Sequence, residues 1–412
     1  MEKTFGLLGE KLGHSFSPLI HTYLGNYDYP LYEISSNDFD RFMTERNFDG
    51  INVTIPYKQA VIPYCTTLSD EAQVIGSVNT IIKDENGALH GHNTDYHGLC
   101  VLLEHGRIDP GDKKTLVLGD GGSARTVRVA LKGLGAREVV TISRRGEDNY
   151  ENISRHYNAE IIINTTPVGM YPNNGNTPLS LKGFEQLAGV VDLIYNPMRT
   201  KLLLEAEQVG VPSINGLSML VAQAEMASRL FLGTPARPER IDKILNVIRG
   251  KVLNIVLIGM PSCGKSTVGA SISKMTGRPL VDIDTSIIET AGRSIPEIFA
   301  EGGEEAFRLL ETRILGEAAK KSGLVIATGG GVVTQPRNLD LLRQNSIIVW
   351  LKRELTELST DGRPLSESVG VEKLARQRLP LYESWCDFSV EVSAEPEQIA
   401  IKILDNFNAY NA

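Results

Sequence analysis

A chain of 412 residues exceeds what one hydrophobic core usually organises, so two or three domains are expected. Its net charge of -8 argues against the basic face that nucleic-acid binding needs, and no stretch reaches the roughly 20 apolar residues of a membrane span. The four cysteines form no CxxC pair, which argues against a zinc site or a disulfide framework and favours a soluble protein of the reducing cytoplasm.

The first part of the chain alternates between short apolar strands and segments of helical period. Strands are expected at residues 5–8 and 50–55, with helical segments at 18–23 and 36–46. After the Pro-Gly pair at 110–111, a strand at 115–118 leads into a glycine-rich turn, followed by a helix at 125–134 and a strand at 139–143. This order predicts a βαβ unit within an α/β fold.

The first α/β unit continues to about residue 248, and a second α/β unit then begins. Strands at 161–164 and 190–193 continue the first parallel sheet, and helices are expected at 218–230 and 239–248. Residues 249–251 then form a short linker into a new buried strand at 253–258, so the main boundary is expected near Gly250.

The turn GDGGSA between the first strand and helix of the βαβ unit has dinucleotide-binding spacing. Gly119, Gly121 and Ala124 match G-x-G-x-x-A, which lets the backbone approach a pyrophosphate at a helix N-terminus, although a plain tight turn would have similar residues. The next strand ends in Ser-Arg-Arg at 143–145, where an NAD site usually has an acidic residue. Two cations favour the 2′-phosphate of NADP, unless they are only a solvated strand end.

The segment GMPSCGKST at 259–267 satisfies G-x-x-x-x-G-K-[ST] directly after a predicted strand. Backbone N–H groups of this loop should cradle phosphates, Lys265 should reach the β and γ oxygens, and Ser266 should ligate Mg²⁺. The pattern by itself indicates only a P-loop NTPase.

Motifs spread over the first half resemble those of the shikimate dehydrogenases. They are GEKLGHSFSPLIH from residue 9, NVTIPYK from 52, GSVNT from 76, GHNTDYHG from 91, NTTPVGMYP from 164, VDLIYNP from 191 and NGLSMLVAQ from 215. The resemblance implies an N-terminal α/β substrate domain and a Rossmann domain that reduce 3-dehydroshikimate to shikimate with NADPH.

The resemblance also implies the roles of individual residues in this half. Lys58 and Asp95 should form the catalytic pair, because hydride addition to a ketone creates an alkoxide that an oriented ammonium can stabilise and protonate. As alternatives, Lys58 is a surface lysine and Asp95 caps the helix that begins near Tyr96. The substrate should contact Ser15, Ser17, Thr54, Lys58, Asn79, Asp95, Tyr195 and Gln223, and NADP should contact Gly119, Gly121, Gly122, Ser123, Ala124, Ser143, Arg144, Arg145 and Gly216.

One residue of the glycine-rich turn departs from the family's pattern. Asp120 stands where the family usually has a small residue, and a carboxylate near a pyrophosphate repels it. We therefore expect reduced cofactor affinity, unless the side chain points to solvent and its charge is screened.

The second half resembles the shikimate kinases through VDIDT at 281–285, IPEIFAEGGEEAFRLLE at 295–311, ATGGGVV at 327–333, GRPL at 362–365 and RLPLYE at 378–383. The resemblance implies that Asp284 holds the hydroxyls of shikimate and takes the proton of the attacking 3-hydroxyl. The other substrate-binding residues should be Arg308, Gly330, Gly331 and Arg378. ATP should contact Gly259, Pro261, Ser262, Cys263, Gly264, Lys265, Ser266, Thr267 and the lid residue Arg363, with Ser266 and Asp282 at the metal.

Three positions of the second half leave alternatives open. Arg363 either meets the transferring phosphoryl group or pairs with Glu367. The family commonly has a further lid arginine where this chain has Thr356, and Arg353 is a candidate to replace it. Cys263 is expected to be a small filler of the phosphate loop, with redox control as the alternative.

Together the two halves predict one bifunctional enzyme, because the product of the first reaction is the substrate of the second. The expected domains are residues 1–108, completed by helices in about 216–249, for the first substrate, 109–215 for NADP, and 252–412 for the kinase. The alternatives are a quinate/shikimate-type dehydrogenase fused to the kinase, or one half acting as a non-catalytic regulatory module. The expected partners are the small molecules 3-dehydroshikimate and shikimate, with no nucleic acid or membrane, and a homo-oligomer is compatible with the sequence.

Overall fold

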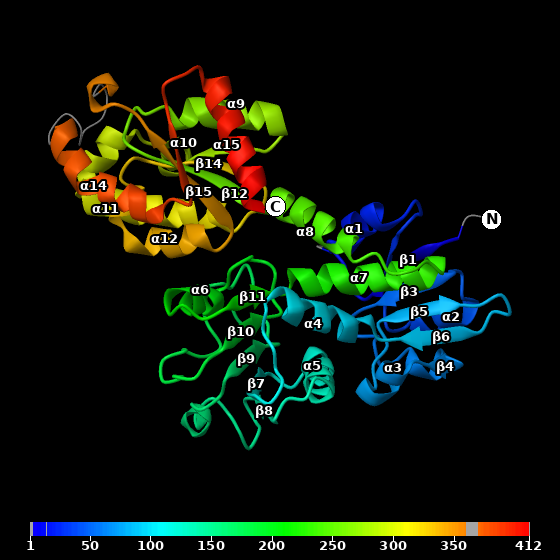
Figure 1. The fold of residues 1–412 in the computed structure, drawn as a ribbon. Helices are drawn as coiled ribbons and strands as arrows, with labels where there is room; N and C mark the ends of the chain where they lie inside the picture. The colour runs from blue at the N-terminus through cyan, green and yellow to red at the C-terminus, as the bar shows by residue number, and fades with distance from the viewer. Residues whose placement is uncertain (1–2, 14, 360–369, 412) are drawn as a thin grey trace. The chain divides into compact units, whose positions relative to one another are not determined.

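The computed structural model describes residues 3–13, 15–359 and 370–411, and it confirms the α/β fold class (Figure 1). The chain divides into two compact units. The first comprises Met1–Tyr195 and Glu205–Leu245, and the second comprises Asn196–Leu204 and Asn246–Ala412. Within the described ranges no helix combines the length and apolarity needed to cross a membrane.

The first unit begins with a six-stranded mixed sheet in the order β2-β1-β3-β5-β6-β4. β5 runs antiparallel to both of its neighbours, whereas β1 pairs in parallel with β2 and β3. The strands are β1 (Phe5–Gly9), β2 (Leu31–Glu33), β3 (Gly50–Val53), β4 (Thr67–Leu68), β5 (Thr80–Lys83) and β6 (Leu89–His92). The helices are α1 (Ser17–Leu24), α2 (Phe39–Glu45) and α3 (Asp70–Ile75), and Leu8, Ile51 and Ile81 lie in the buried core.

The second sheet of this unit is parallel throughout, in the order β11-β10-β9-β7-β8. Its strands are β7 (Lys114–Leu118), β8 (Glu138–Ile142), β9 (Ile161–Asn164), β10 (Gly189–Asp192) and β11 (Ser213–Asn215), with helix α5 (Gly122–Gly133). Helix α6 (Lys201–Gln208) begins in the second unit and ends in the first. Helix α4 (Thr94–His105) leads from β6 into this sheet, and α7 (Leu217–Leu232) returns from β11 and packs along α4 and α1 (Figure 1). The loops at the ends of these helices therefore meet residues from both sheets.

The second unit is built on one parallel sheet in the order β13-β14-β12-β15-β16. Its strands are β12 (Asn254–Ile258), β13 (Leu280–Asp282), β14 (Val325–Ala327), β15 (Ser346–Lys352) and β16 (Phe388–Glu391). Its helices are α9 (Lys265–Thr276), α10 (Ile283–Ala291), α11 (Ile295–Ala319), α12 (Pro336–Arg343), α14 (Val371–Trp385) and α15 (Pro396–Asn411). The fully buried strand β12 places the phosphate-loop sequence at its carboxyl end, where ligands bind in sheets of this kind.

The expected linker at residues 249–251 is wrong, because helix α8 (Glu239–Val252) continues through it. Two side-chain N–H groups of Arg278 donate to the carbonyls of Gly250 and Leu253, and they satisfy acceptors that a helix end otherwise leaves open. The glycine thus lies inside the last turn of the helix, while the division between the two units falls after Leu245, near the boundary expected at Gly250.

Candidate active sites

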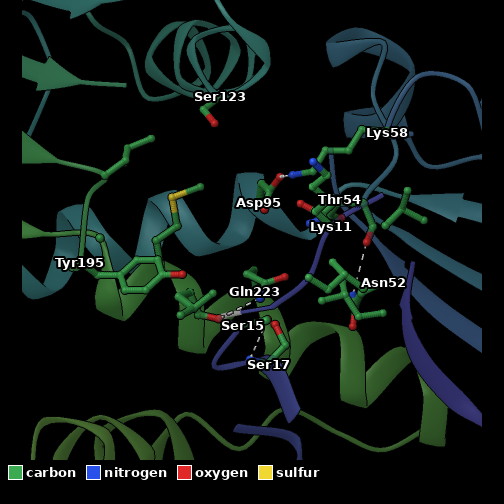
Figure 2. Close-up of a pocket in the computed structure, with 18 of the residues that line it drawn as sticks. Lys11, Ser15, Ser17, Asn52, Thr54, Lys58, Asp95, Ser123, Tyr195 and Gln223 are labelled. Carbon is green, nitrogen blue, oxygen red and sulfur yellow. Dashed lines mark hydrogen bonds and ion pairs between the residues drawn. The ribbon is translucent and has the colours of Figure 1, made fainter. Parts of the chain in front are cut away.

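A cavity of about 590 Å³ in the first unit gathers side chains from both of its sheets (Figure 2). Residues distant in the sequence meet here because α4 and α7 carry the chain between the two sheets. Every side chain expected to touch the first substrate lines this cavity, and so do two residues expected at NADP: Ser15, Ser17, Thr54, Lys58, Asn79, Asp95, Ser123, Tyr195, Gly216 and Gln223.

The centre of the cavity is an ion pair between Lys58 and Asp95. Nζ of Lys58 lies 2.6 Å from Oδ2 of Asp95, and both side chains retain some exposure, 28% and 17%. Asp95 sits in the first turn of α4, but the cap of that helix is Asn93, whose side chain accepts a bond from the backbone N–H of Tyr96. The alternative that Asp95 caps the helix is therefore wrong, and its carboxylate is directed to the lysine instead.

The polar wall beside this pair is held rigid by buried amides. Oδ1 of Asn79 accepts a bond of 2.7 Å from the backbone N–H of Thr94, at the start of α4. Asn52, which the sequence did not single out, accepts a bond of 2.6 Å from the Tyr29 hydroxyl and donates one of 2.9 Å to Thr80. Its place at the head of NVTIPYK was the available signal, because Asn52 and Lys58 bracket the same turn after β3.

Hydroxyl and amide groups lie toward the other end of the cavity. Oγ of Ser15 accepts a bond of 3.1 Å from the backbone N–H of Ser17, and Nε2 of Gln223 donates to the carbonyl of Leu220. Burial raises the pKa of the Tyr195 phenol, so its hydroxyl stays protonated at neutral pH and can donate to an anion. This wall offers donors for a carboxylate or hydroxyls.

The glycine-rich turn leaves an open cradle at the start of α5. Gly119 has φ of +102°, and a Cβ there would lie 2.9 Å from the side chains of Thr165 and Thr166. At Gly121 and Gly122 a Cβ would meet nothing within 4 Å, and the helix start has no side-chain cap, so its N–H groups are left for a ligand. The residues present fit a dinucleotide pyrophosphate.

A second cavity of about 550 Å³ lies at the end of β8 and is lined by Asp120, Arg144 and Arg145. Ser143, which precedes the arginines, is buried. Two guanidinium groups suit a ribose 2′-phosphate, so the donor set fits NADP. Asp120 lines the same cavity, so its carboxylate lies near the two arginines expected at the 2′-phosphate.

The phosphate loop of the second unit has the backbone that a P-loop needs. Gly259, Ser262 and Gly264 all have positive φ, at +147°, +63° and +98°. Nζ of Lys265 donates to the carbonyls of Gly259 and Met260 at 3.0 and 2.9 Å, and the side chain of Cys263 is buried beneath the loop. The lysine is thus held inside the loop that would surround the phosphates.

The two side chains expected to bind the metal, Ser266 and Asp282, are in contact. Oγ of Ser266 lies 2.5 Å from Oδ2 of Asp282, and the other carboxylate oxygen of Asp282 accepts a bond from the backbone N–H of Thr285. A hydroxyl and a carboxylate are ligands that Mg²⁺ prefers, so this pair fits the ion directly or through its water shell. Asp284 follows in the first turn of α10.

The acceptor side of the second site is a buried cluster of charges around three glycines. Arg308 donates to Glu311 at 2.7 Å and to Glu304 at 3.1 Å, and although burial opposes its charge, these glutamates hold the pKa of Arg308 above its usual range. A Cβ on Gly329 would lie 2.6 Å from Glu311 and 2.9 Å from Asp284, and one on Gly331 would lie 2.0 Å from Arg308. The glycines therefore allow the close approach of backbone to the charged groups.

Two further second-site residues complete the cluster. Arg378 on α14 is buried within electrostatic reach of Arg308, and the hydroxyl of Tyr382 one turn later donates to the carbonyl of Gly330. A Cβ on Gly330 would lie 2.7 Å from Pro261 of the phosphate loop, so the nucleotide and acceptor sides adjoin. The sequence reasoning missed Glu311, whose signal was its position three residues after Arg308 on one helix face.

The residues expected in the lid of the second site lie partly within the described residues. Arg363 and Glu367 lie outside the described residues, so the role of Arg363 stays a prediction. Nε of Arg353 lies 3.0 Å from Oε2 of Glu357, four residues later, so this candidate for the missing lid arginine is engaged in an ion pair.

Comparison with known proteins decides the family. Residues 7–81 match the model of the shikimate dehydrogenase substrate binding domain. The NADP(+)-dependent shikimate dehydrogenase of Clostridium perfringens strain 13 is 39% identical over 254 residues, which cover 56% of this chain and 93% of that protein. The chain belongs to the shikimate dehydrogenase family. A shikimate kinase domain follows it, matching that family's model over residues 261–408.

Solved shikimate dehydrogenases have the same fold as the first unit. The chorismate mutase/shikimate 5-dehydrogenase fusion of Clostridium acetobutylicum is 34% identical with a TM-score of 0.57, and the alignment covers 60% of this chain and 97% of that one. The Thermus thermophilus shikimate dehydrogenase, solved with NADP(H) and shikimate, is 31% identical with a TM-score of 0.54 and covers 59% and 98%. The bifunctional dehydrogenase and kinase organisation predicted from the motifs is confirmed.

Proposed function

We propose that the chain reduces 3-dehydroshikimate to shikimate in the cavity of the first unit and phosphorylates shikimate on its 3-hydroxyl at the P-loop of the second. The dehydrogenase family and the kinase domain supply the two reaction types. The observation that carries the assignment is the 2.6 Å ion pair of Lys58 and Asp95, in one cavity with Ser123 of the dinucleotide turn.

In the reduction, NADPH supplies the hydride to the C3 carbonyl carbon of the substrate. The ammonium of Lys58 stabilises the negative charge that grows on the carbonyl oxygen and then gives it a proton. Asp95 orients the ammonium of Lys58 in the cavity through the 2.6 Å ion pair, and Asp95 is itself fixed by the capped start of α4. Ser15, Ser17 and Tyr195 bind the substrate carboxylate through hydroxyl donors.

In the phosphorylation, ATP would supply the phosphoryl group, and Mg²⁺ held by Ser266 and Asp282 would neutralise phosphate charge. The backbone of residues 259–264 and the ammonium of Lys265 bind the phosphates, while Ser266 and Asp282 hold the ion. Asp284 accepts the proton of the attacking hydroxyl, and Arg308 and Arg378 orient the substrate through its carboxylate.

A coupled assay of the whole chain tests both steps. Purified protein with 3-dehydroshikimate, NADPH and MgATP should consume NADPH and form shikimate 3-phosphate. Lys58→Ala should abolish the first step, and Lys265→Ala should abolish only the second. A parallel assay with quinate and NAD addresses the alternative dehydrogenase specificity.

Each other result leads to a different function. NADPH consumption without phosphorylated product would reduce the second unit to a binding or regulatory module. If the chain oxidised quinate with NAD faster than shikimate with NADP, the first unit would be a quinate/shikimate-type dehydrogenase.

A further inference from the structure

The dehydrogenase cavity has three charged side chains among the described residues, and two of them neutralise each other. Lys58 and Asp95 form the 2.6 Å ion pair, and Lys11 is the third. Lys11 has no hydrogen-bond or ion-pair partner among the described residues. The lining therefore has a net charge of +1, and Lys11 is its source.

The backbone next to Lys11 is anchored, whereas the lysine side chain itself is exposed. The side chain of Leu12 is 5% exposed, and its backbone N–H donates a bond of 2.6 Å to Glu33 at the end of β2. The carbonyl of Leu12 in turn accepts a bond from the backbone N–H of Ser15. Lys11 thus precedes, and the serine hydroxyls expected at the substrate carboxylate follow, the anchored residue Leu12.

A carboxylate that enters this cavity needs a compensating charge. Ser15, Ser17 and Tyr195 offer neutral donors only, and transferring a carboxylate from water to neutral donors alone is costly. Lys58 has its charge already balanced by Asp95, so it contributes little net attraction to a distant carboxylate. Lys11 is exposed and can move toward an anion as it arrives.

We propose that Lys11 is a specificity-determining residue that attracts and balances the carboxylate of the dehydrogenase substrate. This inference rests on the proposed function, since it names the substrate as a monoanion. Lys11 selects for anionic over neutral ring ketones and increases the rate of encounter, while the chemistry at the carbonyl stays with Lys58 and Asp95.

The test compares Lys11→Met, Lys11→Arg and the unaltered chain in NADPH-dependent reduction. Two substrates are used: 3-dehydroshikimate and its carboxamide analogue, which has the same ring and no charge. We expect Lys11→Met to lower kcat/KM for 3-dehydroshikimate about 5- to 10-fold, mostly through KM, as for a partly screened charge pair. The kcat/KM of Lys11→Met for the carboxamide should change less than about 2-fold. Lys11→Arg keeps the positive charge and should therefore retain the kcat/KM of the unaltered chain for 3-dehydroshikimate.

Ionic strength gives an independent readout. The kcat/KM of the unaltered chain for the acid should fall between about 0.02 and 0.3 M salt, and Lys11→Met should remove most of that dependence. Lys182→Met is the matched control, because Lys182 is an exposed lysine of the same unit that lines neither dehydrogenase cavity. Its kinetics should equal those of the unaltered chain.

Two results would overturn the role of Lys11. Equal loss on the acid and the carboxamide would make Lys11 a structural residue of the loop, and no loss on either would make it a solvated lysine at the rim. Phosphorylation of shikimate by the same preparations verifies that the rest of the chain is intact. Absence of reduction by the unaltered chain would instead refute the proposed dehydrogenase function.

Discussion

Lys58 is the residue on which the reduction should depend most strongly. Lys58→Met keeps much of the side-chain volume but removes the proton donor, so kcat for 3-dehydroshikimate should fall about 10²- to 10⁴-fold, as for other general acids. Asp95→Asn should lower it less, because the ammonium remains but loses the ion pair that orients it. NADPH absorbance measures both rates. If kcat fell less than about tenfold in Lys58→Met, a group other than Lys58 would be the proton donor.

Asp120 should weaken the binding of NADPH. Its carboxylate shares a cavity with Arg144 and Arg145, where it competes with the ribose 2′-phosphate for their positive charge. Asp120→Asn should therefore lower the KM for NADPH about 3- to 10-fold at low salt and leave the KM for NADH nearly unchanged. Glu147→Gln removes one exposed carboxylate from the loop after the arginines and should change neither value. An equal improvement for both nucleotides would place the repulsion at the shared pyrophosphate.

His21 should make the stability of the first unit fall with acidification. The ring is buried on α1, stacks on Tyr29 at 3.7 Å and contacts the Tyr27 hydroxyl, and burial lowers the pKa of His21 to about 3. Below the unfolded pKa of about 6.5 the unfolded chain binds a proton that the folded one does not, so stability is lost as the pH falls.

The pH effect of His21 can be isolated by substitution. Between pH 6.5 and 5 this residue should lower the free energy of unfolding by about 2 kcal/mol, and His21→Phe should lack that component. Denaturant unfolding at both pH values gives the free energy of unfolding of the unaltered chain and of His21→Phe. The difference between the two proteins should change with pH by the contribution of His21. The other histidines cancel in this comparison. A difference that is independent of pH would show that His21 takes up a proton as readily in the folded chain as in the unfolded one.

At the scale of elements, the apolar runs were the reliable signal. The strand expected at 161–164 is β9 (Ile161–Asn164), and the helix expected at 18–23 is α1 (Ser17–Leu24), because buried parallel strands and amphipathic helices leave unambiguous patterns. The contacts between elements left no such pattern. The cavity that Lys11 lines is formed by residues distant in the sequence, and Glu311 is completely buried beside Arg308. Neither property can be read from residue type alone.

The loop after β14 should tolerate no side chain at Gly331. Its φ of -97° suits any residue, so the obstacle is steric: a Cβ would lie 2.0 Å from Arg308 and displace it from Glu311. Gly331→Ala should lower kcat/KM for shikimate phosphorylation about 10²-fold, as a misplaced orienting group does. Gly316→Ala on α11 is the matched control, since its Cβ would make an ordinary 3.5 Å contact with Leu341. Equal activity of the two variants would contradict a role for Arg308 in orienting the substrate.

For the whole molecule, the two units have separate buried cores, and each contains one of the proposed nucleotide sites. Leu116, Val117 and Ile163 are buried in the first unit, and Val256 and Ile348 are buried in the second. A ligand that binds only the folded form stabilises the unit that binds it, by about 2.7 kcal/mol at a concentration 100 times its Kd. Each nucleotide should therefore protect its own unit.

Hydrogen exchange of the whole chain, read on peptides from β7 and β9 and from β12 and β15, separates the two responses. NADP⁺ should slow exchange in the first pair of strands, and MgADP should slow it in the second. Lys265→Met should weaken the MgADP response without altering the NADP⁺ response, because Lys265 lies in the loop that binds the phosphates. Protection of both pairs of strands by either nucleotide alone would mean that the units unfold as one, and the two activities could then not be varied independently by substitutions in one unit.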